Sequence, residues 1–302
     1  MDLAFFHLRE EPFRLTPDPR FLHFAEPHRT AFTTLVKGVT ARKGIIVLTG
    51  PVGTGKTTLL HFLLKVLAEK KASGGPVASA FLWNPTLTPP EFLEAVLDEL
   101  GIDCPSASKP RRLSALHQKL LETQRRNGTA VLLVDEAHLL SWELLEEVRL
   151  LSNIDTYAAK LLQIVLAGQP ELSALLKQPR ARALQQRVGA QCELRPLSLA
   201  ETRAYVAQRL HVAGSDGASP FLPRALEAIH QYAEGIPRMI NQLCDGCLEM
   251  GFDAKNNQIG VNIVEDAAAA LGFHGSSAAA PVGERAIHPG GTGAGQAMPQ
   301  VS

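Results

Sequence analysis

The chain has 302 residues, 45% hydrophobic and 20% charged, a composition typical of a soluble globular protein with one large domain or two ordinary ones. Its 30 basic residues balance 30 acidic residues, so the chain has no net positive charge that would favour a nucleic-acid partner. No run reaches the ~18 apolar residues of a membrane span, the N-terminus lacks signal-peptide features, and four cysteines are too few for a disulfide framework. We therefore expect a cytoplasmic protein.

The first 28 residues are rich in proline and phenylalanine. Each proline fixes its own φ and disfavours helix in the residue before it, so we expect an extended, turn-rich leader. Five of the twelve phenylalanines lie in this leader: Phe5, Phe6, Phe13, Phe21 and Phe24.

The next segment, 29–196, alternates apolar runs with amphipathic stretches. We expect helices at 26–42, 56–71, 88–101, 111–126 and 141–153, and strands within 44–50, 76–84, 129–138, 160–172 and 191–197. Strands that alternate with helices predict an α/β domain with a mostly parallel sheet covered on both faces, with right-handed crossovers.

The strand pattern stops after residue 196. Four helix-like stretches follow, at 198–214, 222–235, 236–252 and 260–273, and glycines interrupt them. This change in composition predicts a second, all-helical domain over 197–273. The remaining segment, 274–302, is rich in glycine, alanine and proline, and we expect it to be disordered and dispensable for catalysis.

A glycine-rich loop between a buried strand and a helix is the most specific motif. It matches G-x-x-x-x-G-K-[ST] at every fixed position. Glycines let backbone N–H groups surround phosphate oxygens, the lysine reaches the β- and γ-phosphates, and the threonine after it can ligate Mg²⁺. A plain strand–helix turn is the alternative. The predicted ATP-binding residues are Gly50, Pro51, Val52, Gly53, Thr54, Gly55, Lys56, Thr57 and Thr58.

An acidic pair, Asp135 and Glu136, follows the buried strand VLLV. Ligands of open α/β sheets bind at the carboxyl ends of the strands. We expect Asp135 to hold Mg²⁺ together with Thr57, and Glu136 to act as the general base that orients water. The alternative is an acidic pair that only starts a turn.

Two polar residues are predicted to contact the phosphates. Gln169 lies just past another strand, where it can sense the γ-phosphate, although it is equally a turn residue before a proline. Arg238 lies in the first turn of a helix in the second domain, an unfavourable place for a cation. We expect it to point at a phosphate across the domain cleft; a solvated surface arginine is the alternative.

Three arginines precede the last strand: Arg180, Arg182 and Arg187. One of them is a candidate arginine finger that reaches the nucleotide of a neighbouring subunit. We favour Arg187, with Arg182 second, and a solvated basic face remains the alternative.

Two further motifs have weaker functional interpretations. Cys244 and Cys247 form C-x-x-C, but no second pair at zinc spacing exists, which favours two core cysteines. The letters DEAH suggest a helicase, but such a helicase needs two RecA-like domains, and the helical segment is too small to be one.

Together, the P-loop, the Asp-Glu pair, the polar sensor position and Gly-x-Pro-Arg resemble an AAA+ ATPase over residues 28–272. Stretches 12–60, 150–172 and 195–210 resemble more closely the ExeA-like, or general secretion pathway protein A, family. The resemblance implies strand order 5-1-4-3-2, nucleotide between the domains, a homo-oligomer, and Arg238 as sensor 2. It also implies the cofactors ATP and Mg²⁺.

The family's secretion members continue into a transmembrane helix and a peptidoglycan-binding domain, which this sequence lacks. We therefore expect an ATPase that serves a secretion, pilus or exopolysaccharide-export complex, peripheral at the inner membrane only through a partner. A DNA-binding transposition regulator of the TniB/TnsC type is the alternative. We expect some of the leader phenylalanines to cover the sheet edge or the nucleotide pocket as core side chains. The remaining ones would form an exposed apolar surface that contacts a partner protein.

Overall fold

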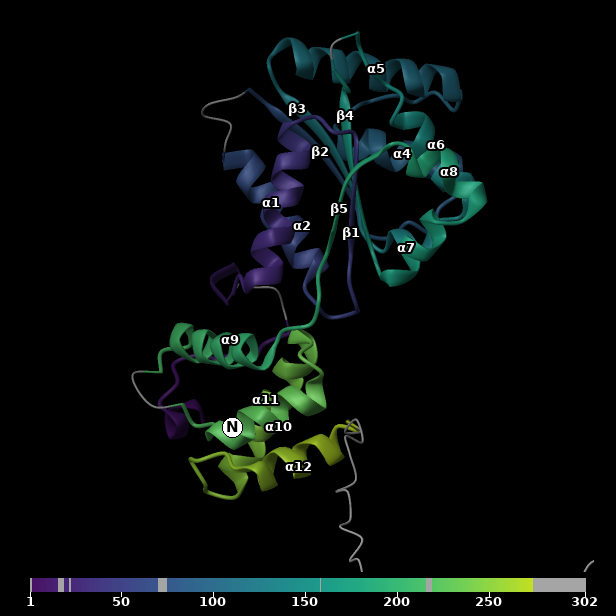
Figure 1. Ribbon diagram of the computed structural model, residues 1–302. Helices are drawn as coiled ribbons and strands as arrows, with labels where there is room; N and C mark the ends of the chain where they lie inside the picture. The colour runs from purple at the N-terminus through teal and green to yellow at the C-terminus, as the bar shows by residue number, and fades with distance from the viewer. Residues whose placement is uncertain are drawn as a thin grey trace, which may run out of the picture.

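The computed structural model describes residues 2–15, 19–21, 23–69, 75–157, 159–215 and 219–273. The tail 274–302, predicted to be disordered, lies outside the described residues. A five-stranded sheet has the order β2-β3-β4-β1-β5, and every strand pair is parallel (Figure 1). This confirms the predicted order 5-1-4-3-2. The strands are β1 (Ile45–Thr49), β2 (Val77–Leu82), β3 (Thr129–Val134), β4 (Leu162–Gly168) and β5 (Val188–Glu193).

Helices cover both faces of the sheet because the central strands are apolar on both sides. In β1, Ile45 and Val47 face one layer, whereas Ile46 and Leu48 face the other. The second layer contains α1 (Glu26–Thr40) and α2 (Lys56–Glu69). The first contains α4 (Pro89–Glu99), α5 (Lys109–Arg125), α6 (Trp142–Leu151), α7 (Pro170–Leu176) and α8 (Arg182–Gln185).

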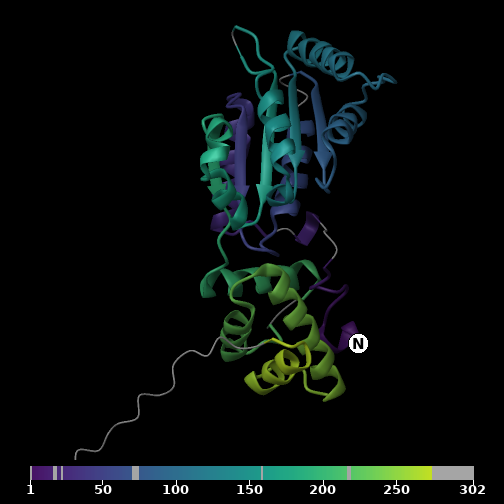
Figure 2. The same ribbon diagram turned by 90° about the vertical axis from the view of Figure 1, so that its right-hand side faces the viewer.

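A separate helical bundle, here called the lid, follows β5 (Figure 2). It consists of α9 (Leu199–Val212), α10 (Pro223–Ala233), α11 (Pro237–Asp253) and α12 (Val261–Ala270). Helix α9 begins with a capping box, in which Ser198 accepts from the Glu201 N–H and Glu201 accepts from the Ser198 N–H. Ser141 caps the start of α6, since its side chain accepts from the Leu144 N–H.

The leader packs mainly against the lid. Of the two places that we expected its phenylalanines to cover, the sheet edge is not covered by these side chains, whereas Phe21 does line the cavity at the P-loop. Phe6, Leu8, Phe13 and Phe21 are buried in the same cluster as the lid helices. One exception is Phe24, whose ring contacts those of Phe32 on α1 and Phe62 on α2. The leader includes two short 3₁₀ turns, η1 (Leu3–Phe6) and η2 (Pro19–Phe21). The lid core is therefore built from both ends of the described chain.

Cys244 and Cys247 are fully buried in the lid core. Burial raises the pKa of the Cys247 thiol to about 12 and that of Cys244 well above its usual value. Among the described residues, no cluster of three or more His, Cys, Asp or Glu side chains could hold a metal ion. Both thiols thus pack as neutral core side chains.

One strand begins earlier than the sequence pattern predicts. Strand β5 starts at Val188, whereas we expected it to begin near Gln191. Its side chains alternate between half-buried and exposed because it lies at the sheet edge, so the segment lacks the continuous apolar run that reveals the central strands.

Replacement of Phe13 by alanine tests the packing of the leader on the lid. The Phe13 side chain is 1% exposed and its ring lies edge-on to that of Phe221. We expect Phe13→Ala to lower the free energy of unfolding by about 3–5 kcal/mol, because it leaves a cavity in the lid core. Urea unfolding followed by circular dichroism measures this. Leu15→Ala, at a side chain 52% exposed, is the control, and an equally small loss for both variants would contradict this packing.

Candidate nucleotide-binding site

The glycine-rich loop connects β1 to α2 and has the backbone of a phosphate-binding loop. Gly53 and Gly55 have φ angles of 80° and 94°, a region that side chains other than glycine rarely adopt. A Cβ at Gly53 would lie 2.8 Å from the Arg238 Cβ, so the lid approaches the loop closely. Both glycines are therefore required by the turn, and Gly53 is required also by the approach of the lid.

Lys56 is buried at the start of α2. Its Nζ donates to the carbonyl oxygens of Gly50 at 2.9 Å and Pro51 at 3.0 Å. Burial lowers the pKa of Lys56, and the Glu136 and Asp135 carboxylates act in the opposite direction. Among the described residues no carboxylate lies within ion-pair distance of its Nζ. An anionic ligand would complete the surroundings of this ammonium group.

Thr57 and Asp135 are joined directly. Thr57 Oγ1 donates to Asp135 Oδ2 at 2.5 Å, and Asp135 Oδ1 accepts from the Glu136 N–H at 2.9 Å. Mg²⁺ in nucleotide sites is held by one or two protein oxygens, water and substrate phosphates. A hydroxyl and a carboxylate beside the loop fit that requirement, so these two residues are the ones that would hold Mg²⁺.

Glu136 adopts a strained backbone at the end of β3. Its φ of 48° is rare for a residue other than glycine. The buried atom Glu136 Oε2 has no hydrogen-bond partner, although His138 Nδ1 lies 3.4 Å away. The Glu136 side chain as a whole is 41% exposed and lines the cavity described below, so its carboxylate can receive a proton from water there.

Gln169 directly follows the end of β4 and is the N-cap residue of α7. Its backbone N–H donates to His138 Nδ1 at 3.4 Å, so His138 bridges the ends of β3 and β4. Gln169 does not line the cavity described below, and its role as a sensor stays a prediction. His138 is a residue that sequence reasoning missed, although the letters DEAH contain it.

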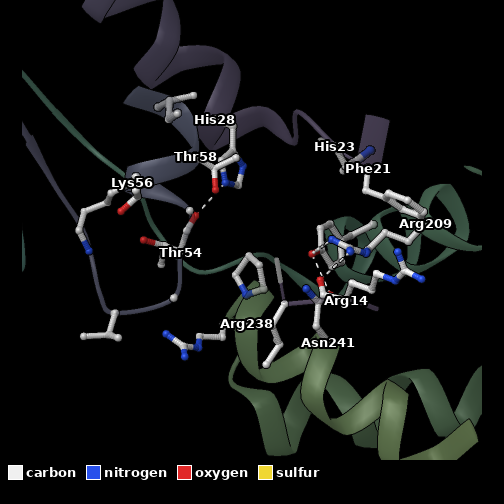
Figure 3. A pocket seen from close by; sticks show the side chains of 18 of the residues that line it. Arg14, Phe21, His23, His28, Thr54, Lys56, Thr58, Arg209, Arg238 and Asn241 are labelled. Atoms are coloured by element: carbon white, nitrogen blue, oxygen red, sulfur yellow. Dashed lines mark hydrogen bonds between the residues drawn. The ribbon is translucent and has the colours of Figure 1, made fainter. Parts of the chain in front are cut away.

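A cavity of about 330 Å³ lies between the P-loop and the lid (Figure 3). Of the predicted site residues, it brings together Val52, Gly53, Thr54, Gly55, Lys56, Thr57, Thr58, Glu136 and Arg238. The lid is joined to the loop there, because the Arg238 N–H donates to the Gly53 carbonyl at 3.2 Å. Gly50 and Pro51 contact the site through Lys56, and Asp135 through Thr57.

The leader supplies part of the cavity wall, as expected for one of its phenylalanines, Phe21. Arg14, His23 and His28 line the cavity too, together with Tyr205, Arg209 and Asn241 of the lid, and these residues were not predicted. Arg209 is buried and donates to the carbonyls of Pro12 at 2.5 Å and Arg14 at 3.1 Å. Its guanidinium also lies over the Phe21 ring, 5.1 Å from the centroid. The leader is thus fixed to the lid at the cavity.

His28 has one hydrogen bond and one free buried nitrogen. Its Nε2 lies 2.9 Å from the Thr54 carbonyl, which can only accept, so Nε2 carries the proton. Its Nδ1 is buried without a hydrogen-bond partner, and the residue lines the cavity. No motif signals this residue, because its contact with the loop is 26 positions away in sequence.

The buried imidazole of His28 should make the free energy of unfolding depend on pH. Burial lowers the pKa of its imidazole below the usual 6.5. The unfolded chain therefore binds more protons than the folded chain as pH falls below 6.5, and stability decreases. We expect His28→Gln to flatten this decrease between pH 6.5 and 5, measured by urea unfolding at several pH values. The exposed residue His117 provides the control His117→Gln, and identical slopes for His28→Gln and wild type would refute the assignment.

The three candidate finger arginines do not line the chain's own cavity. The Arg180 guanidinium lies 4.8 Å from the Trp142 ring centroid, and Arg182 is exposed on α8. Arg187 precedes β5, whose first residue pairs with Ile45, whereas the P-loop follows the other end of β1. Arg187 is thus separated from its own P-loop by the length of a strand, and a finger role stays a prediction that requires a neighbour.

Known proteins resemble this chain over much of its length. Residues 39–176 match a family model described as an AAA domain. General secretion pathway protein A from Aeromonas hydrophila is 40% identical over 261 residues, which are 86% of this chain and 46% of the relative. The chain therefore spans about half the length of that relative. The resemblance to general secretion pathway protein A is confirmed.

Solved structures show the same fold. The Aeropyrum pernix ORC2 protein, in ADPNP and ADP complexes, is 18% identical with a TM-score of 0.63, over 86% of this chain and 71% of that chain. Drosophila ORC bound to DNA is 19% identical with a TM-score of 0.68, over 86% of this chain and 64% of that chain. The expected AAA+ architecture is thereby confirmed, and it supports an ATPase. Residues 39–176 thus match an AAA domain, within a chain that has the AAA+ fold and resembles general secretion pathway protein A.

Proposed function

We propose that this chain is an Mg²⁺-dependent ATP hydrolase. The contact between Thr57 and Asp135 carries the proposal, because it places both expected Mg²⁺ ligands beside Lys56 and Glu136. A structural turn would need neither the buried lysine nor the unpaired acceptor of Glu136.

Each residue has a distinct task in hydrolysis. The N–H groups of the P-loop and Lys56 hold the phosphates of ATP. Thr57 and Asp135 would hold Mg²⁺, and the ion would supply positive charge beside the phosphate oxygens. Glu136 orients the attacking water and accepts its proton. Arg238, at the start of α11, connects the phosphates to the lid.

Replacement of Lys56 tests the proposed function. We expect Lys56→Ala to weaken ATP binding by about 10- to 100-fold, because a hydrogen bond to a charged group contributes about 1.5–3 kcal/mol. Isothermal titration with Mg-ATP measures it. Lys65→Ala removes an exposed lysine from the same helix and is the matched control. Equal affinity of Lys56→Ala and wild type would reject the phosphate site.

The cellular role is also a proposal. The name of the 40% identical relative supports work in a secretion pathway. Our proposal extends this to a secretion, pilus or exopolysaccharide-export complex that a homo-oligomer of this chain serves in the cytoplasm. No helix among the described residues is long and apolar enough to cross a bilayer. ATP turnover measured with and without duplex DNA tests this role. Strong stimulation by DNA would favour a transposition regulator of the TniB/TnsC type instead.

A further inference from the structure

Basic side chains from two helix ends gather at the end of the molecule opposite the lid. Lys37 lies in the last turn of α1, and Arg42 and Lys43 follow it. Arg125 and Arg126 end α5, which lies far from the lid in both views (Figures 1 and 2). All except Arg42, which is half-buried, are exposed.

Hydrogen bonds hold these two groups of cations side by side. Arg42 Nη2 donates at 2.8 Å to the carbonyl of Gly128, which lies two residues after Arg126. Arg42 Nη1 donates at 3.5 Å to the Lys160 carbonyl, at the base of the loop that connects α6 to β4. The ends of α1 and α5 and this loop therefore form one continuous surface.

Acidic side chains lie near this surface, since Glu99 and Glu122 line a cavity together with Arg126, but none of them forms an ion pair with it. None of the five basic side chains has an aspartate or glutamate within ion-pair distance among the described residues. A helix dipole stabilises a cation near its own last turn, which favours Lys37 and Arg125 separately. It does not explain why two helices bring five cations together. A polyanion would offset their mutual repulsion.

An exposed aromatic ring protrudes from the same end. The loop 154–161 is closed by backbone bonds from Leu161 N–H to the Ile154 carbonyl at 3.1 Å and from Thr156 N–H to the Ala159 carbonyl at 2.9 Å. Tyr157 lies at its tip and is fully exposed. Figure 2 shows this loop beside α5, at the end away from the lid.

We propose that this surface, formed by Lys37, Arg42, Lys43, Arg125, Arg126 and Tyr157, binds an anionic lipid bilayer directly. Basic residues are attracted to anionic headgroups, and tyrosine favours the membrane–water interface, where its ring is partly buried and its hydroxyl stays in water. A bilayer thus engages both features of the surface at once. Binding in this orientation leaves the lid facing away from the membrane.

The shape of the surface favours a bilayer over single-stranded nucleic acid. Proteins that bind single strands combine a basic groove with aromatic rings on which successive bases stack. Here one exposed aromatic ring stands on a protruding loop, outside any described cavity. Because no part of the surface touches ATP, the proposal stands or falls separately from the ATPase assignment.

Vesicle binding by the full chain tests the proposal. Vesicles of phosphatidylcholine with 30% phosphatidylglycerol should bind wild type at least tenfold more tightly than pure phosphatidylcholine vesicles, in a flotation assay. Arg125→Glu with Arg126→Glu should weaken binding at least 25-fold, since each basic residue contributes about fivefold. Arg125→Gln with Arg126→Gln repeats the test with a milder change. Tyr157→Trp should show a blue-shifted emission on anionic vesicles.

Arg224→Glu with Lys255→Glu is the matched control, because it makes the same charge change at exposed positions of the lid. It should leave vesicle binding within about twofold of wild type. Equal binding to neutral and anionic vesicles, or equal losses for the control and the Arg125 and Arg126 variants, would overturn the proposal. Binding of DNA but not of vesicles through Arg125 and Arg126 would overturn it too, and identify a nucleic-acid surface.

Discussion

Glu136→Gln is expected to slow ATP hydrolysis by about 100-fold or more, because positioned general bases contribute about 10²–10⁴ in rate. ATP affinity should stay within a few fold of wild type, since Glu136 is assigned to water and not to the phosphates. Phosphate release under saturating Mg-ATP measures the rate, and isothermal titration measures the affinity.

The control for this experiment is Glu122→Gln, at an exposed position of α5. It should leave both quantities unchanged. If Glu136→Gln hydrolyses ATP at the wild-type rate, another group is the base, and the buried unpaired oxygen of Glu136 has a structural role instead.

Arg187→Ala is expected to slow hydrolysis about 10³-fold in the assembled protein, because an arginine finger contributes that much or more. Arg187 lies at the end of the sheet away from its own P-loop, so it could reach only the nucleotide of a neighbouring subunit. A mixture of Arg187→Ala and Lys56→Ala proteins should therefore regain part of the lost activity, because a hybrid interface combines an intact Lys56 with an intact Arg187.

The competing arginines serve as controls. Arg182→Ala should give the larger loss if the second choice is the true finger, whereas Arg180, which contacts the Trp142 ring, should affect the rate least. Specific activity should also rise with protein concentration. Constant specific activity over a hundredfold dilution, together with a monomeric mass in ATP, would rule out a shared site.

The sheet and the P-loop could be predicted because their signals are local. Each buried strand is a run of apolar residues, and the loop between Gly50 and Thr57 is contiguous in sequence. The order of the strands was expected from family resemblance, not from the residues themselves. Strand β5 was placed late because an edge strand alternates weakly between buried and exposed positions.

The part of the cavity wall formed by the leader and by Arg209 could not be predicted in detail, because it depends on contacts between residues that are distant in sequence. Arg209 binds the carbonyl of Pro12, 197 positions away, and no periodicity or motif encodes that pair. The place of His28 in the cavity wall likewise depends on its contact with the Thr54 carbonyl, 26 positions away. The phenylalanines of the leader indicated burial correctly, but hydrophobic burial has no direction, so composition could not distinguish the lid from the sheet edge.

The most direct test of the ATPase assignment is the rate of phosphate release from ATP by the purified chain, with Mg²⁺ and with excess EDTA. We predict steady turnover that requires Mg²⁺ and falls to background in Lys56→Ala, because Thr57, Asp135 and Lys56 converge on one site. Turnover that persists in EDTA or in Lys56→Ala, or tight Mg-ATP binding without any turnover, would contradict this account.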